Sequence, residues 1–409
     1  MNKNRIVTCL FISIVLVSLQ ACGAGETAST PTSTAGLLPE ATMTESPQPT
    51  STATLVPTAT ITLTPTPTPQ SLMVSQTPVA LTKITVDNMS RLELLTKLDP
   101  GFTSDVLAFS ADGNSLASGL AKEAFWKELL GSNKIQVWNL ADSSLAYTIE
   151  IPGTLSSFSY EDEYIKIATC TNGVWYGCLG SEILQWKASD QSLASKADVK
   201  GLVYVFPPKD MPMVLHLSTT SYDNYQLWDV GSGNPQKIYD IIQTLEWDAS
   251  MAYSIDGEHF VIGIGTVLKL YATSSDQPVI LEDPDDINKN RYTAMVFFPD
   301  GSILASGNGG GNIRLWQVSD GNVTQKFNGH TGAIDTMAFS ADGSMLASIS
   351  ADNSLRIWNV ADGTSVTVDG VCSGKGYKAA RCAVAFSPTG TLIATVGWPD
   401  KNIHLWGVR

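Results

Sequence analysis

Short apolar segments recur along the second part of the chain, and each is bounded by turn-forming residues. Residues 334–360 carry three of them, Ile334–Ser340, Met345–Ser350 and Leu355–Val360, separated by Asp342-Gly343 and Asp352-Asn353. Segments of this length between such turns predict an antiparallel meander, with a fourth strand after Asp362-Gly363. The segments alternate poorly between apolar and polar positions, which indicates sheets that are packed on both faces.

An aromatic residue ends such a segment seven times, at Trp138, Trp186, Trp228, Tyr271, Trp316, Trp358 and Trp406. By subtraction the steps are 48, 42, 43, 45, 42 and 48 residues. This is the period of a four-stranded propeller blade. We therefore predict an all-β fold, a seven-bladed β-propeller over residues 83–409. A propeller is a scaffold, so the period alone does not indicate a function.

The clearest repeat begins at Gly329-His330, and its Phe339-Ser340-Ala341-Asp342-Gly343 frame recurs near Phe109, Phe298 and Phe386. At these residues the chain resembles the WD40 repeat family. The resemblance implies that His330, Ser348, Asp352 and Trp358 form a structural hydrogen-bond relay. His, Ser and Asp are also the parts of a catalytic triad, but the resemblance favours a buried structural network.

The two ends of the predicted propeller suggest how it closes. The last repeat stops at Arg409, three residues after Trp406, and so lacks a fourth strand of its own. The apolar segment Arg91–Leu98 precedes the first blade and belongs to none. We expect this segment to pair beside the strand that ends at Trp406, because closure removes the exposed edges of an open sheet.

The N-terminus indicates export. Lys3 and Arg5 precede an apolar run from Ile6 to Leu19, which has the length of a secretory signal. The following Leu19-Gln20-Ala21-Cys22 resembles a bacterial lipobox, although Gln20 departs from its usual residue type. We predict a signal peptide over residues 1–21 and lipidation of Cys22; ordinary secretion and an uncleaved anchor are the alternatives. Residues 22–82 are rich in Thr, Ser and Pro and predict a disordered, extended tether.

Four further cysteines form two sequence-local pairs, Cys170 with Cys178 and Cys372 with Cys382. In an exported protein such pairs predict disulfides. Zinc is the alternative, but no further Cys or His lies at ligand spacing near either pair.

Insertions enlarge the predicted propeller at 120–134, 170–178, 282–293 and 372–382. Loops between strands two and three and loops between blades emerge at the same end, so we expect these insertions to lie on one rim. A short helix is expected within 121–130. The insertions and the last inner loop carry the aromatic residues of a candidate binding rim, Phe125, Trp126, Trp175, Tyr176, Tyr377 and Trp398. Alternatively, each aromatic covers its own loop.

An acidic stretch from Asp283 to Asn290 resembles a calcium loop in composition. It lacks the mid-loop Gly and the terminal Glu of an EF-hand, so a solvated acidic loop is favoured over a calcium site.

The wider composition excludes one class of partner. The formal net charge of −14 repels phosphate backbones and argues against nucleic acid.

These patterns together favour a lipid-anchored, extracytoplasmic propeller in a bacterial cell envelope. We expect a monomeric scaffold that binds a protein or an envelope or extracellular ligand and contacts the membrane through its lipid alone. No catalytic residue, metal or cofactor is expected. The alternative is a secreted propeller enzyme, a hydrolase or lyase with a site in the central channel. A sensory domain of a larger assembly is a third possibility.

Overall fold

The structure is a computed structural model. It describes residues 81–102, 104–120, 133–171, 173–174, 177–178, 180–200, 202–205, 213–217, 224–229, 234–240, 249–275, 277–285, 290–372, 382–397 and 401–409. All of them belong to one compact unit, Thr58–Arg409. Side chains of 199–249 and of the short hairpin β8 (Gly173–Val174) and β9 (Gly177–Cys178) are not described.

The described strands form seven four-stranded antiparallel sheets. The first three contain β2 (Val106–Phe109), β3 (Ser115–Gly119), β4 (Lys134–Asn139) and β5 (Ser144–Glu150); β6 (Thr154–Glu161), β7 (Tyr164–Cys170), β10 (Gly180–Lys187) and β11 (Ser192–Lys200); and β12 (Leu202–Val205), β13 (Met213–Leu217), β14 (Asn224–Asp229) and β15 (Asn234–Asp240). The next three contain β16 (Ala249–Tyr253), β17 (His259–Ile264), β18 (Val267–Ala272) and β19 (Val279–Leu281); β20 (Tyr292–Phe297), β21 (Ile303–Asn308), β22 (Ile313–Gln317) and β23 (Val323–Phe327); and β24 (Ile334–Phe339), β25 (Met345–Ser350), β26 (Ser354–Asn359) and β27 (Ser365–Asp369). The last contains β28 (Ala383–Phe386), β29 (Leu392–Val396), β30 (Ile403–Gly407) and β1 (Glu93–Leu98).

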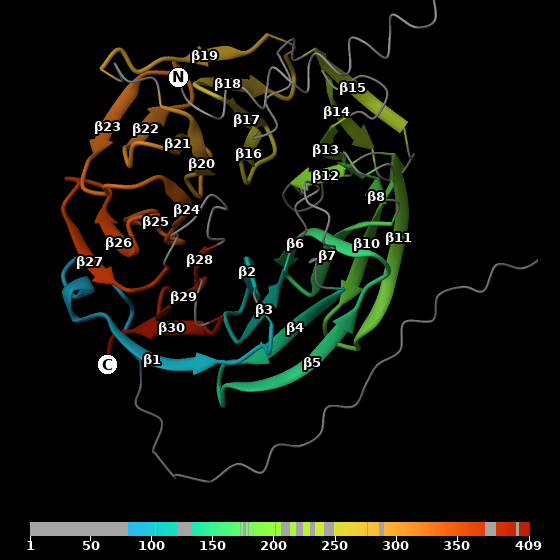
Figure 1. Ribbon diagram of the computed structural model, residues 1–409, viewed down its shortest axis with the longest axis horizontal. Helices are drawn as coiled ribbons and strands as arrows, with labels where there is room; N and C mark the ends of the chain where they lie inside the picture. Colours follow the sequence, from blue (N-terminus) through green and yellow to red (C-terminus); the bar gives the residue numbers. More distant parts are fainter. Residues whose placement is uncertain are drawn as a thin grey trace, which may run out of the picture. The chain divides into compact units, whose positions relative to one another are not determined.

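The sheets are arranged as in a β-propeller. The first strand of each sheet contacts the first strands of its neighbours, in the order β2, β6, β12, β16, β20, β24, β28 and back to β2. Figure 1 shows these strands innermost and the fourth strands outermost. The prediction of an all-β propeller is confirmed.

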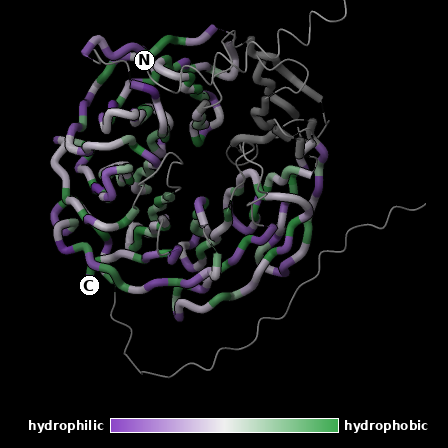
Figure 2. Tube along the Cα trace, in the orientation of Figure 1, coloured by the Kyte–Doolittle hydropathy of each residue, from purple (hydrophilic) through white to green (hydrophobic). Residues whose placement is uncertain are grey.

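The spaced aromatics mark equivalent positions, because each lies on the third strand of its sheet. Trp316 and Trp358 are fully or almost fully buried. The described core side chains form five clusters, and each combines side chains from two neighbouring sheets. Figure 2 shows hydrophobic and hydrophilic positions interspersed along the coloured strands. Burial on both faces explains why the sequence segments alternate so poorly.

The segment before the first sheet lies beside the C-terminal strand. Strand β1 pairs antiparallel with β30, with Leu94 opposite Trp406. The predicted strand began two residues too early, because Met89–Arg91 forms a 3-10 helix. Upstream, Thr82 forms a bridge with Val408, and the fully buried Ile84 donates its backbone N–H to the carbonyl of Gly390.

The turns between the first and second strands share one geometry in several sheets. In the turn after β24, the Ser340 hydroxyl donates to Asp342 at 2.7 Å and Gly343 has φ +70°. The turns at Gly113, Gly257, Gly301 and Gly390 have the same left-handed glycine. These turns also touch: a Cβ at Gly343 would lie 2.0 Å from the Phe298 ring of the preceding sheet's turn. Glycine is required there by both the backbone and the neighbouring sheet.

Candidate functional site

The four predicted relay residues lie together in the sheet β24–β27. His330 precedes β24, Ser348 is on β25, Asp352 is in the β25–β26 turn and Trp358 is on β26. The Trp358 indole Nε1 donates to the Ser348 Oγ at 2.8 Å, and the His330 Nε2 lies 2.8 Å from the same oxygen. The His330 Nδ1 lies 2.9 Å from the Asp352 Oδ2. The contacts therefore link Trp358 in the core, through Ser348 and His330, to Asp352 in the turn.

The chemistry of the partners assigns the proton positions. An ionised carboxylate accepts only, so His330 carries its proton on Nδ1 and donates to Asp352. Its Nε2 then accepts from the Ser348 hydroxyl, which in turn accepts from Trp358. Burial lowers the pKa of His330, with the Asp352 contact opposing this, and the ring is neutral at neutral pH.

The Asp352 carboxylate is held by several donors. Its Oδ1 accepts from the Ser354 backbone N–H and hydroxyl, and its Oδ2 accepts from the Thr331 N–H and His330. Burial raises the pKa of Asp352, but the hydrogen bonds from Ser354, Thr331 and His330 outweigh it and hold the pKa at about 2. The carboxylate is therefore ionised across the neutral range and fixes the turn.

The surroundings of the relay exclude a substrate. Ser348 is fully buried, and the Trp358 ring stacks on Phe327 of the preceding sheet at a centroid distance of 5.2 Å. A Cβ at Gly329 would lie 2.9 Å from the Arg356 guanidinium and 3.1 Å from the Trp358 ring. A hydroxyl so enclosed has no path to an external carbonyl, so the arrangement stabilises the fold and lacks the access that acyl transfer needs.

The link from indole to hydroxyl recurs beyond the relay. Trp316 donates to Ser306 at 2.8 Å, Trp406 to Thr395 at 2.9 Å, and Trp138 to Ser118 at 3.2 Å. In contrast, the buried Trp186 Nε1 has no partner in the described part of the chain. These pairs were not among the predicted site residues. Of these three pairs, Ser306 and Trp316 repeat the ten-residue spacing of Ser348 and Trp358, whereas Thr395 stands 11 residues before Trp406 and Ser118 stands 20 before Trp138.

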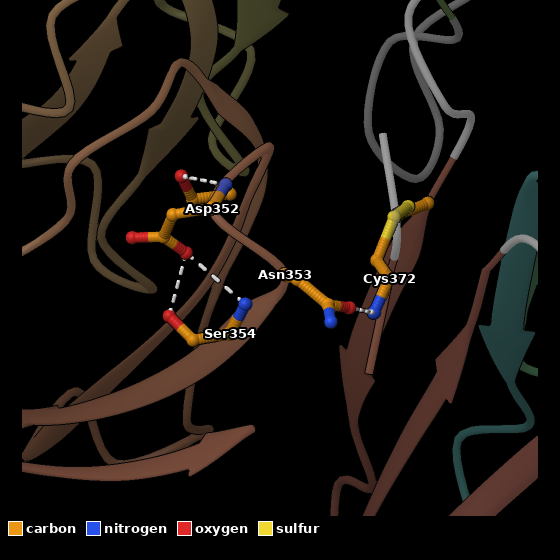
Figure 3. Close-up of a disulfide and its surroundings, with 6 residues drawn as sticks. Asp352, Asn353, Ser354 and Cys372 are labelled. Carbon is orange, nitrogen blue, oxygen red and sulfur yellow. Dashed lines mark hydrogen bonds between the residues drawn. A yellow bond between two sulfur atoms is a disulfide. The ribbon is translucent and has the colours of Figure 1, made fainter. Parts of the chain in front are cut away.

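A disulfide joins Cys372 and Cys382, whose Cα atoms are 6.3 Å apart, and both side chains are buried. Figure 3 shows how it is attached to the relay turn: the Cys372 backbone N–H donates to the side-chain oxygen of Asn353 at 3.1 Å. Cys170 is also disulfide-bonded, while the side chain of Cys178 lies outside the described residues.

The acidic stretch is not simply solvated, and this corrects the sequence interpretation at Asp283. Its side chain is 1% exposed. Its Oδ2 accepts from the Arg314 Nε, and its Oδ1 accepts from the Lys326 Nζ at 2.9 Å. Burial raises the pKa of Asp283, but its contacts with Arg314 and Lys326 outweigh burial and lower it. Both oxygens are engaged by cationic side chains, so a calcium ion would have to displace them.

The candidate binding rim lies outside the described residues. This holds for Phe125, Trp126, Trp175, Tyr176, Tyr377 and Trp398, and for the helix expected within 121–130. Asp286, Asn288 and the rest of 286–289 lie outside them as well. Within the described ranges, no helix is both long enough and apolar enough to cross a membrane.

Comparison with known proteins identifies the repeats. The model of the family described as "WD domain, G-beta repeat" matches residues 288–317, 321–359 and 370–407. These ranges cover strands β20–β26 and β28–β30, which belong to the sheet β20–β23, the sheet with the relay and the last sheet of the chain. No curated protein matches the chain. The matched ranges and the arrangement of the sheets agree, and the chain is therefore a β-propeller that carries WD40 repeats within residues 288–407.

Proposed function

We propose that this chain is an exported, lipid-anchored WD40 propeller that serves as a binding scaffold in a bacterial cell envelope. The observation that carries the proposal is the set of WD40 repeats within a propeller. Such a body presents loops on a rigid frame, which is where binding residues usually lie. The partner is a protein or an envelope or extracellular ligand, and the propeller acts as a monomer without a catalytic step.

The membrane attachment rests on the lipobox-like Leu19–Cys22, followed by the Thr/Ser/Pro-rich tether of residues 22–82. Acyl chains on Cys22 would hold the tether at a membrane surface, with the propeller of residues 83–409 at its far end. Expression of the full chain in a bacterial host with labelled palmitate tests this directly. Label should enter the wild type and be absent from Cys22→Ala, with Cys9→Ala as the control that keeps it. Equal labelling of the two variants would contradict the anchor.

The binding surface is the rim of loops that carries the six aromatic residues named above. Affinity capture with residues 81–409 tests it, using Trp126→Ala, Trp175→Ala and Trp398→Ala. Loss of the captured ligand in at least one variant supports the rim. The matched control is Ile255→Ala, which removes an exposed apolar side chain from a first-to-second-strand turn. Capture that none of the three tryptophan changes alters, or that Ile255→Ala alone abolishes, contradicts the rim as the binding surface.

The closed ring is also part of this proposal. Strand β1 supplies the fourth strand beside β30, and its removal would leave the β30 edge unpaired. A chain that begins after Pro100 should unfold at a clearly lower temperature than one that begins at Leu81. An unchanged melting temperature would show that β1 is dispensable for closure.

A further inference from the structure

A carboxylate without a partner lies beside the disulfide of the last connection. Asp335 is the second residue of β24, and its buried Oδ2 has no hydrogen-bond partner among the described residues. One carboxylate oxygen of Asp335 and the sulfurs of Cys372 and Cys382 all lie within 4.8 Å of one another. Burial, and after it the nearby Asp352, raise the pKa of Asp335 to about 7.

The repeat itself brings these groups together. Asp335 directly precedes Thr336, which pairs with Ile349, and Cys382 directly precedes Ala383, which pairs with Val396. Asp335 and Cys382 thus occupy equivalent positions at the starts of β24 and β28, two first strands that contact each other. Cys372 is held from the other side through its N–H bond to Asn353. Strand β24, the residue before β28 and the connection after β27 therefore meet at this cluster.

Neighbouring sheets use this position differently. The Thr293 hydroxyl, at the matching place in β20, donates to the Ile334 carbonyl of the next sheet at 2.6 Å. In β16 the residue one register position further along, Ser250, reaches the Tyr292 carbonyl with its hydroxyl at 3.4 Å. At this position Asp335 instead places a carboxylate oxygen within 4.8 Å of the sulfurs of Cys372 and Cys382, a set of donors that suits a thiophilic cation.

No positive group in the described surroundings fills this role. Within the described residues, Asp335 has neither a hydrogen bond nor an ion pair through its side chain. The nearest titratable partner of Asp352, His330, is neutral because burial lowers its pKa. The Arg356 guanidinium lies over the Trp358 ring, 5.6 Å from its centroid. Two carboxylates and two sulfurs thus share a region that the described side chains leave without a cation.

We propose that, once the Cys372–Cys382 disulfide is reduced, Asp335, Cys372 and Cys382 bind a thiophilic divalent cation such as Zn²⁺. Two thiolates and one carboxylate are three of the four ligands of a tetrahedral zinc site, and water takes the fourth position. A dithiol reductant transfers two electrons and two protons to the disulfide and becomes a cyclic disulfide itself. The two thiols release their protons to solvent when the metal binds. Oxidation to the disulfide removes the site, and reduction creates it. Tyr377 of the proposed binding rim lies between the two cysteines in the sequence, but zinc uptake is measured without the ligand of the rim, so the two proposals are tested separately.

Metal uptake by the purified full chain tests the proposal. The protein is reduced with a dithiol, freed of reductant without oxygen, incubated with Zn²⁺, desalted and analysed for bound zinc. The oxidised protein is carried through in parallel. Its zinc content is subtracted from that of the reduced protein. This removes the zinc held by groups that reduction does not alter, such as the cluster of Asp256, Glu258 and His259. We expect one additional zinc per reduced chain.

The variants assign the ligands. Cys372→Ser/Cys382→Ser should lose the additional zinc, whereas Cys170→Ser/Cys178→Ser should keep it. Asp335→Asn leaves the disulfide intact and should weaken zinc binding to the reduced protein by about tenfold or more. Asp369→Asn makes the same charge change at an exposed position of β27 and should leave binding unaltered.

Three outcomes would overturn the proposal. One is a reduced wild type that takes up no more zinc than the oxidised protein. A second is uptake that survives Cys372→Ser/Cys382→Ser. The third is an Asp335→Asn protein that binds zinc as tightly as Asp369→Asn, which would leave a two-cysteine site without the carboxylate. Circular dichroism of each variant checks that it is folded, and the Asp335→Asn comparison remains decisive if the double cysteine variant is not.

Discussion

Replacing Ser348 by Ala should destabilise the propeller more than the same change at Ser306. Both hydroxyls accept from a tryptophan Nε1 at 2.8 Å on the neighbouring strand. Only Ser348 also bonds a histidine, His330. The two substitutions therefore remove the same atom from two nearly equal environments, and their difference reports the contribution of the relay.

The expected magnitudes follow from what each change leaves unpaired. Ser306→Ala leaves one buried indole N–H without an acceptor, which costs about 1–3 kcal/mol. Ser348→Ala leaves the Trp358 N–H and the His330 Nε2 unpaired, which costs about 2–5 kcal/mol. We expect the free energy of unfolding to differ between the two variants by about 1–2 kcal/mol. The buried Trp186 N–H, which has no partner within the described ranges, is an example of the state that each substitution would create.

Urea unfolding followed by far-ultraviolet circular dichroism measures the difference. This signal is preferable to tryptophan fluorescence, since each substitution alters the surroundings of an indole. Equal slopes with urea concentration are required before the midpoints are converted to free energies. Variants of equal stability, or a less stable Ser306→Ala, would refute the view that the histidine link stabilises this sheet.

Four further substitutions have defined outcomes. Gly343→Ala should lower the free energy of unfolding by about 2–4 kcal/mol, because the backbone is left-handed and the new Cβ overlaps Phe298. Gly101→Ala has the same backbone strain, with φ +71°, but nothing within 4 Å of the new Cβ, and should cost only about 1 kcal/mol. Thermal or urea unfolding measures both. Asp283→Asn should lower the free energy of unfolding by about 3 kcal/mol, since the buried Arg314 guanidinium loses its carboxylate and keeps its hydrogen bonds to Ile313 and Asn328 alone. An unchanged urea midpoint would contradict this. The pKa of Asp352 is about 2 in the folded protein and about 3.9 in the unfolded chain. Its contribution to the free energy of unfolding is therefore present above about pH 4 and is lost as the pH falls towards 2. Over that range, the melting temperature of Asp352→Asn should depend less on pH than that of the wild type.

The propeller could be predicted because each repeat needs a large side chain at the same position. A large aromatic such as Trp316 fills the space between two sheets, so the same position in each repeat needs a similar residue, and the period appears in the sequence. The relay around His330 could also be predicted, because the resemblance of residues 329–360 to the WD40 family implies it. The other tryptophan partners were missed because a Ser or Thr without the His attracts no notice, although Ser306 stands at the same distance from its Trp as Ser348 does.

The burial of Asp283 could not be predicted in this way. Its partners Arg314 and Lys326 are 31 and 43 residues away in the sequence. Their contact depends on how the connection before β20 folds over β22 and β23, which no local pattern encodes. The convergence of Asp335 with Cys372 and Cys382 is of the same kind. It follows from the register of two neighbouring first strands, and register becomes visible only when the sheets are assembled.

The touching turns restrict how this protein can change in length. A Cβ at Gly301 would lie 2.8 Å from Asp256, and one at Gly113 would lie 2.9 Å from Thr389, so each turn occupies the space beside the next. An added residue in one turn would displace its neighbour, and that displacement would pass from sheet to sheet. Loop grafts, tags or inserted domains should therefore be rejected at these turns. Where the described turns touch in this way, evolution and engineering alike have less room for added length than in the connections at the other ends of the strands.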